Sequence, residues 1–88
     1  MAVYCVSYDL KGTDEPLEAA LRSKGKWWHF LQSTWLLATD ETPAEIWDRI
    51  RSTIRKQDFL LIIEVRDNAQ GWLPKQAWDW IHANVPSP

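Results

Sequence analysis

The chain has 88 residues, of which 45% are hydrophobic and 25% charged, a composition typical of one folded domain rather than of a disordered segment. Ten basic and twelve acidic residues give a formal charge of −2, so the strong positive charge common in nucleic-acid-binding proteins is absent. One cysteine excludes an internal disulfide, no apolar run reaches about 18 residues, and from the N-terminal pattern we expect no signal peptide. We therefore expect a single cytoplasmic domain over residues 1–88 that does not associate with membranes.

A strand and then a helix are expected at the start of the chain. Residues 2–9 are rich in Val and Tyr and precede a polar turn, which is typical of a strand. Thr13 or Asp14 then caps a helix that ends before Gly25, a residue type favoured just beyond a helix. Three apolar residues at helical spacing form the buried stripe of this helix: Leu17, Ala20 and Leu21.

Two short strands and a second helix come next. The strands are expected over residues 26–32 and 34–39, joined either by a hairpin turn or by a bend within paired strands. The strongest local signal in the sequence follows, because Thr42 at the N-cap, Pro43 at the first helical position and Glu45 at the third make a capping box. Basic residues gather in the later turns of this helix, where the helix dipole favours cations.

The last part of the chain contains a strand and a third helix. Residues 59–66 are almost continuously apolar, which is typical of a strand covered on both faces. A loop follows, Pro74 opens a helix, and residues 86–88 are expected to form a frayed tail. The order β-α-β-β-α-β-α predicts an α+β protein with a ferredoxin-like βαββαβ arrangement, an antiparallel sheet and an extra C-terminal helix.

The strand pattern predicts a sheet face that the first two helices leave uncovered. The covered face is expected to carry Tyr4, Val6, Phe59, Leu61, Ile63 and Val65. The opposite face is too apolar to be left in water, so either the third helix or a second copy of the chain covers it. Because one short helix is too small for the whole face, we expect a homodimer with the interface residues Val3, Cys5, Ser7, Leu36, Leu60 and Ile62.

Tryptophan is unusually frequent, with seven residues in the chain. Large rings of this kind either fill the core of a small protein or line a surface through which it associates. On the third helix, Trp78 and Ile81 are expected to be buried.

Signals of catalysis or cofactor binding are sparse, and no cofactor is expected. There is no Gly-rich phosphate loop and no His pair at metal-ligand spacing, and Cys5 in mid-strand is typical of inert packing. Asp9 is the notable carboxylate, because it ends the first strand on the uncovered face. In a two-fold dimer it meets its own copy, and the two carboxylates share a proton or bind a cation such as Mg²⁺. Alternatively, Asp9 caps the turn at residues 11–13.

Short motifs resemble known families. Residues 6–10 (VSYDL) and 31–36 (LQSTWL) resemble segments of the small CRISPR-associated ferredoxin-fold proteins that join the integrase in spacer acquisition; VapD-type ribonucleases share that fold. Along most of its length, including residues 27–29 (WWH) and 71–75 (GWLPK), the chain resembles the bacterial SinR-like family. The resemblance implies a ferredoxin-like homodimer in which Asp9 matches the metal-binding aspartate of the CRISPR-associated proteins.

The first helix departs from that pattern. The CRISPR-associated proteins open it with several basic residues, whereas this chain opens it with Asp14, Glu15 and Pro16 and adds Glu18. Each phosphate contact that is lost weakens nucleic-acid binding, and a shared fold does not imply a shared function. The sequence therefore favours a non-catalytic homodimeric interaction protein with an unidentified protein partner. The alternative is a metal-dependent nuclease or nucleic-acid-binding protein that uses Asp9 of both protomers.

Overall fold

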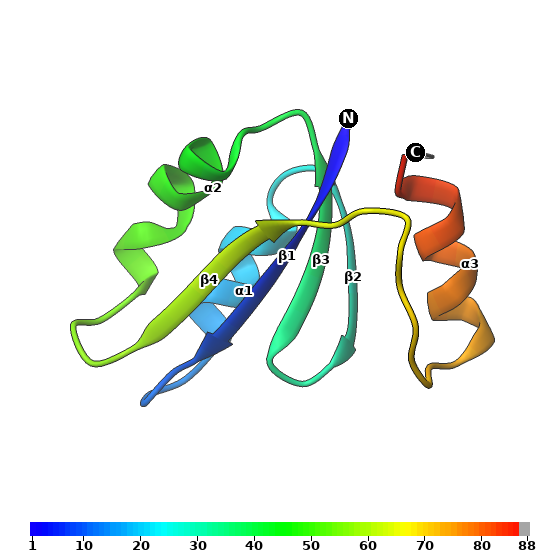
Figure 1. The fold of residues 1–88 in the computed structure, drawn as a ribbon. Helices are drawn as coiled ribbons and strands as arrows, with labels where there is room; N and C mark the ends of the chain where they lie inside the picture. Colours follow the sequence, from blue (N-terminus) through cyan, green and yellow to red (C-terminus); the bar gives the residue numbers. More distant parts are fainter. Residues whose placement is uncertain (87–88) are drawn as a thin grey trace.

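The computed structural model describes residues 1–86 and has an α+β fold of the ferredoxin-like type (Figure 1). Within these residues, one antiparallel sheet has the spatial order β2-β3-β1-β4 and consists of β1 (Ala2–Asp9), β2 (Lys26–Leu31), β3 (Thr34–Thr39) and β4 (Phe59–Glu64). The helices are α1 (Glu15–Arg22), α2 (Pro43–Ile50), which continues into the 3-10 turn η1 (Arg51–Thr53), and the C-terminal α3 (Lys75–Asn84). The predicted fold class is confirmed. The last two residues of the expected tail, 87 and 88, lie outside the described residues.

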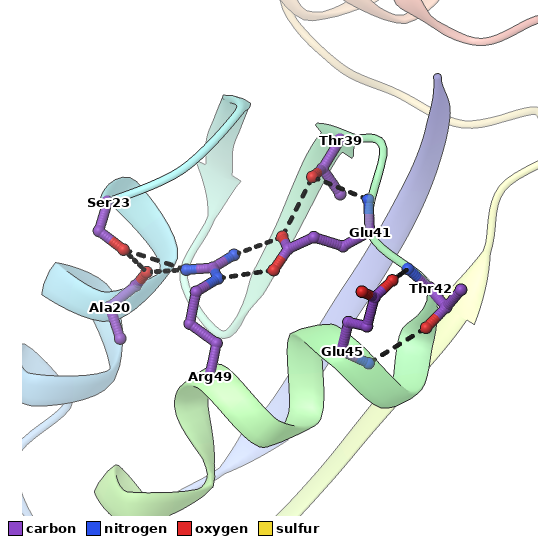
Figure 2. A network of polar contacts seen from close by, with 7 residues as sticks. All are labelled: Ala20, Ser23, Thr39, Glu41, Thr42, Glu45 and Arg49. Atoms are coloured by element: carbon purple, nitrogen blue, oxygen red, sulfur yellow. Dashed lines mark hydrogen bonds and ion pairs between the residues drawn. The ribbon is translucent and has the colours of Figure 1, made fainter.

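Two local sequence signals set element ends where they were predicted, at the start of α2 and just after α1, whereas β2 and β4 end one and two residues earlier than predicted. The side chain of Thr42 accepts a hydrogen bond from the Glu45 N–H at 3.2 Å, and the Glu45 carboxylate accepts one from the Thr42 N–H at 2.9 Å, which confirms the capping box (Figure 2). Gly25 has a φ of +80°, and a Cβ at this position would lie 2.5 Å from the Ala38 carbonyl oxygen. Glycine is therefore required where the chain turns from α1 into β2.

One face of the sheet packs against α1 and α2, and Trp35 is the largest fully buried side chain of this core. Its ring is fully buried, and its indole N–H donates to the Tyr8 hydroxyl at 3.0 Å. This bond gives the indole nitrogen a partner, without which its burial would cost free energy. The other buried members of the core come from β1, β3 and both helices: Tyr4, Val6, Leu17, Leu21, Leu37, Ile46 and Ile50.

A polar network ties the two helices to the end of β3 (Figure 2). The guanidinium of Arg49 on α2 donates to both carboxylate oxygens of Glu41, each at 2.9 Å, and Glu41 also accepts from the Thr39 hydroxyl at 3.1 Å. Arg49 further donates to the Ala20 carbonyl and to the Ser23 hydroxyl at the end of α1. The side chains of Glu41 and Arg49 are only 6% and 19% exposed, so this bidentate pair is shielded from solvent.

The C-terminal helix covers part of the opposite face. Ala77 and Ile81 of α3, with Val85 just after it, pack onto β1, β2 and β3 in a second core that contains Val3, Trp28, Leu36 and Ala38. Ile81 is buried as predicted, but Trp78 is only half-buried because it lies at the margin of this contact. In Figure 1, α3 lies beyond β2, at the side of the sheet opposite to β4.

The predicted facing of β4 is wrong. Leu60 and Ile62 pack against the core beneath α1 and α2, whereas Phe59, Leu61 and Ile63 point to the other face. Side chains alternate along a strand, so an error of one residue moves every side chain of the strand to the wrong face. In a run that is apolar at odd and even positions alike, hydrophobicity does not determine the facing.

The Arg49–Glu41 pair yields a stability prediction. We expect Arg49→Met to lower the free energy of unfolding by about 3 kcal/mol, because it leaves a buried carboxylate without its counter-charge. Arg51→Met is the matched control: Arg51 lies 3.9 Å from Asp48 in an exposed pair, so its loss is expected to cost less than about 1 kcal/mol. Urea unfolding of both variants measures this. An equal loss of unfolding free energy in the two variants would contradict a stabilising role for the buried pair.

The same pair predicts how stability depends on pH. The hydrogen bond from Arg49 holds the pKa of Glu41 below its ordinary value. A carboxyl group whose pKa is lower in the folded state stabilises the fold above its unfolded pKa, and this stabilisation is lost as the pH falls through the folded pKa. Glu41→Gln is therefore expected to be less stable at neutral pH and to lose less stability than the wild type below about pH 5. Urea unfolding between neutral and acidic pH tests this, and parallel curves for the two proteins would refute it.

Candidate interaction surface

The part of the sheet that α3 leaves open carries a row of exposed apolar side chains on β4. Phe59, Leu61 and Ile63 are 72%, 57% and 50% exposed. They are successive residues on one face of the strand, so they form a continuous apolar strip. We call these three residues the β4 strip. Large apolar side chains gathered in one exposed row are typical of an interaction surface.

The neighbouring strand β1 borders this strip. Its cross-strand partners on the same face are Asp9 opposite Phe59, Ser7 opposite Leu61 and Cys5 opposite Ile63. Ser7 and Asp9 are exposed and Cys5 is half-buried. Burial raises the pKa of the Cys5 thiol, so the group is protonated at neutral pH and is a poor nucleophile.

The predicted interface residues are divided by the position of α3. Val3 and Leu36 are buried beneath this helix, while Cys5 and Ser7 lie beside the β4 strip. Leu60 and Ile62 belong to the opposite face, as described above. The residues that the sequence analysis missed are those of the β4 strip, and the alternation of the strand would have identified them once its register with β1 was known.

The two edges of the sheet differ in how they are protected. At the β2 edge, the pairing with β3 shifts register between Trp28 and Leu31, and α3 packs alongside. At the other edge, β4 has β1 as its neighbour on one side and, within residues 1–86, no strand on the other. Strand edges are commonly blunted by bulges, charges or covering elements, because unpaired backbone groups favour association with another strand. At the β4 edge, α2 contacts the strand and Glu64 adds a charge at its end, but among the described residues no register shift and no further strand blunts this edge.

Asp9 lies at the end of β1 with an exposed side chain. The turn that follows is capped instead by Asp58, whose two carboxylate oxygens accept from the backbone N–H groups of Lys11 at 2.8 Å and Arg55 at 2.9 Å. These two bonds lower the pKa of Asp58. The capping role considered for Asp9 is thus carried by Asp58, and a metal-binding role for Asp9 stays a prediction.

A shallow polar depression of about 620 Å³ lies elsewhere, between the start of α1 and the turn that joins β2 to β3. His29 stacks on Trp35 at 4.3 Å and its ring contacts the Gln32 carbonyl at 3.0 Å. Three carboxylates line the depression, from Asp14, Glu15 and Glu18, against one guanidinium from Arg22. This excess of negative charge opposes the approach of a phosphate group.

Among residues 1–86, no three His, Cys, Asp or Glu side chains come together in a group suited to a metal ion. No helix in the same part of the chain has both the length and the hydropathy needed to cross a membrane. The sequence matches no family model and no curated protein, and the chain matches no solved structure.

Proposed function

We propose that this protein is a non-catalytic interaction protein that acts as a homodimer, with β4 and its exposed strip as the contact surface. The observation that carries the proposal is the row of Phe59, Leu61 and Ile63, each at least half exposed, on a strand that lies at the edge of the sheet. Burying such side chains stabilises association by about 25 cal/mol for each Å² removed from water.

The charges of the described residues support an interaction role over nucleic-acid chemistry. The depression beside α1 is lined by three carboxylates and one guanidinium, and α1 begins with Glu15 and carries Glu18 in its first turn. On α2, Arg49 is engaged with Glu41 rather than available to a phosphate. Nucleic-acid binding depends on basic side chains that neutralise phosphates, and these surfaces offer few.

A charge placed in the β4 strip is expected to abolish dimerisation. Leu61→Asp puts a carboxylate at the middle of the strip, where it would contact the apolar side chains of a second copy and lose part of its hydration. The control is Trp72→Asp, which makes the same charge change at a residue that is 99% exposed and lies outside the sheet. Light scattering over a concentration series should show the wild type and the control rising from 10.3 kDa to twice that mass. The Leu61→Asp protein should keep the monomer mass.

Two results would count against this proposal. The first is a wild-type protein that stays at the monomer mass up to high micromolar concentration. The second is equal self-association of the wild type and the Leu61→Asp variant, because the contact would then lie away from β4.

The non-catalytic character is tested separately. A nuclease needs a general base and a group that stabilises charge on the phosphate, in addition to a metal-binding carboxylate. We therefore expect no cleavage of single- or double-stranded RNA or DNA by the wild-type protein with Mg²⁺ or Mn²⁺. Metal-dependent cleavage that disappears in the Asp9→Ala variant would overturn the proposal and support the nuclease alternative.

A further inference from the structure

We propose that two copies of the chain join through their β4 edges, antiparallel and related by a two-fold axis at Ile62, so that the two sheets become one continuous eight-stranded sheet. The inference rests on the proposed homodimer and specifies its geometry. It is carried by three properties of β4: the direction of its backbone groups, the charges at its ends and the alternation of its side chains.

The backbone groups that point away from the sheet are identified by the pairing with β1. The N–H of Val65 donates to the Val3 carbonyl at 2.8 Å, so Val65 directs its backbone groups toward β1. Backbone groups alternate in direction along a strand, so those of Leu60, Ile62 and Glu64 point to the free edge. These groups have no strand partner within the described residues, and a second β4 supplies one for each of them.

A two-fold axis at Ile62 gives each of these backbone groups a hydrogen-bond partner on the second copy, in the same way for both copies. In this register Ile62 lies opposite Ile62 of the second copy, and Leu60 lies opposite Glu64. All of these positions direct their backbone groups outward, so they form hydrogen-bonded pairs of an antiparallel ladder. On the open face, Leu61 then lies opposite Ile63 of the second copy, so the two apolar strips contact each other along the joined edge, which covers the sides of these side chains and leaves their outer surface open.

The charges near the ends of β4 favour the register with the axis at Ile62 over the registers with the axis at Leu61 or Ile63. With the axis at Ile62, Asp58 lies across from Arg66 of the second copy just beyond the strand ends; its carboxylate already accepts from two backbone N–H groups, so Arg66 adds an opposite charge beside this turn and no like charges face each other. If the axis moved to Leu61, Asp58 would face Glu64, and these two carboxylates would repel. If the axis moved to Ile63, the Asp58–Arg66 pair would be lost.

This geometry has a consequence for Asp9. Asp9 pairs with Phe59 at one end of β4, and the two-fold axis carries the second Asp9 to the opposite end of the joined strands. Strand spacing and rise then place the two residues about 25 Å apart. A metal ion shared by both Asp9 carboxylates is therefore incompatible with edge pairing, which separates this dimer from the nuclease alternative.

The first test removes an outward-pointing donor without changing the core. Glu64→Pro deletes the N–H that would bond the Leu60 carbonyl of the second copy, while the pairing with β1 loses no donor. Glu64→Thr is the matched control, because it removes the same charge but keeps the N–H. Losing one hydrogen bond from each protomer is expected to weaken dimerisation by about 30-fold or more in the Pro variant, with little change in the control. Analytical ultracentrifugation gives both dissociation constants.

The second test reads the register in the wild-type protein and does not depend on the folding of a variant. In a mixed dimer of labelled and unlabelled chains, a filtered NOE experiment should detect the Hα of Leu61 close to the Hα of Ile63 of the second copy, since these residues form a non-hydrogen-bonded antiparallel pair. A wild-type dimer that lacks this contact, or whose dissociation constant is unchanged by Glu64→Pro, overturns the edge pairing and leaves the homodimer in place. A wild-type protein that stays monomeric overturns both.

Discussion

The ion pair between Glu41 and Arg49 holds the helix layer in place on the sheet. Glu41 follows directly after β3, Arg49 belongs to α2, and the same guanidinium reaches the Ala20 carbonyl and the Ser23 hydroxyl at the end of α1 (Figure 2). One side chain thus connects α1 with the consecutive elements β3 and α2. Because both charges are largely shielded, the pair has to be complete, and an arrangement of the helices that separated it would leave a buried charge.

With α1 and α2 packed on one face of the sheet, α3 is the helix that covers part of the other face. This helix buries Val3, Trp28 and Leu36, and it sits on the β2 side of the sheet. The indole N–H of Trp28 is buried there without a hydrogen-bond partner among the described residues. The contact between α3 and the sheet is therefore stabilised by apolar packing and not by this polar group. This helix does not extend over β4, which is why the apolar strip is exposed, and β4 is also the last strand of the sheet, so the exposed strip and an edge that is unpaired within residues 1–86 occur in the same element. The proposed interaction follows from this one-sided cover.

Sequence patterns predicted the fold well where the signals are local. The capping box at Thr42 and the helix end before Gly25 are set by residues close in the chain, and both are found in the structure; the close approach of the Ala38 carbonyl to Gly25 is a long-range contact that the sequence does not show. The Glu41–Arg49 pair was missed, because nothing in the sequence shows that a carboxylate after one strand meets an arginine eight residues later while that arginine also contacts another helix.

Which side chains of β4 point inward could not be predicted from the sequence pattern either. Apolar residues occur at every position from Phe59 to Ile63, so periodicity carries no information about which of them point inward. The pairing with β1 decides it, and that pairing is a long-range contact. The tryptophans divide in the same way: Trp35 and Trp28 are buried, whereas Trp72 is fully exposed, and composition does not distinguish them.

The most direct measurement of the central claim, that β4 is the edge where two copies meet, is residue-resolved amide hydrogen exchange at several protein concentrations. The amides of Leu61 and Ile63 point to β1 and should be protected at every concentration. The amides of Leu60, Ile62 and Glu64 point outward, so the account predicts that their protection rises with concentration and follows dimer formation. Rapid exchange of these three amides at a concentration where the protein is dimeric would contradict the account.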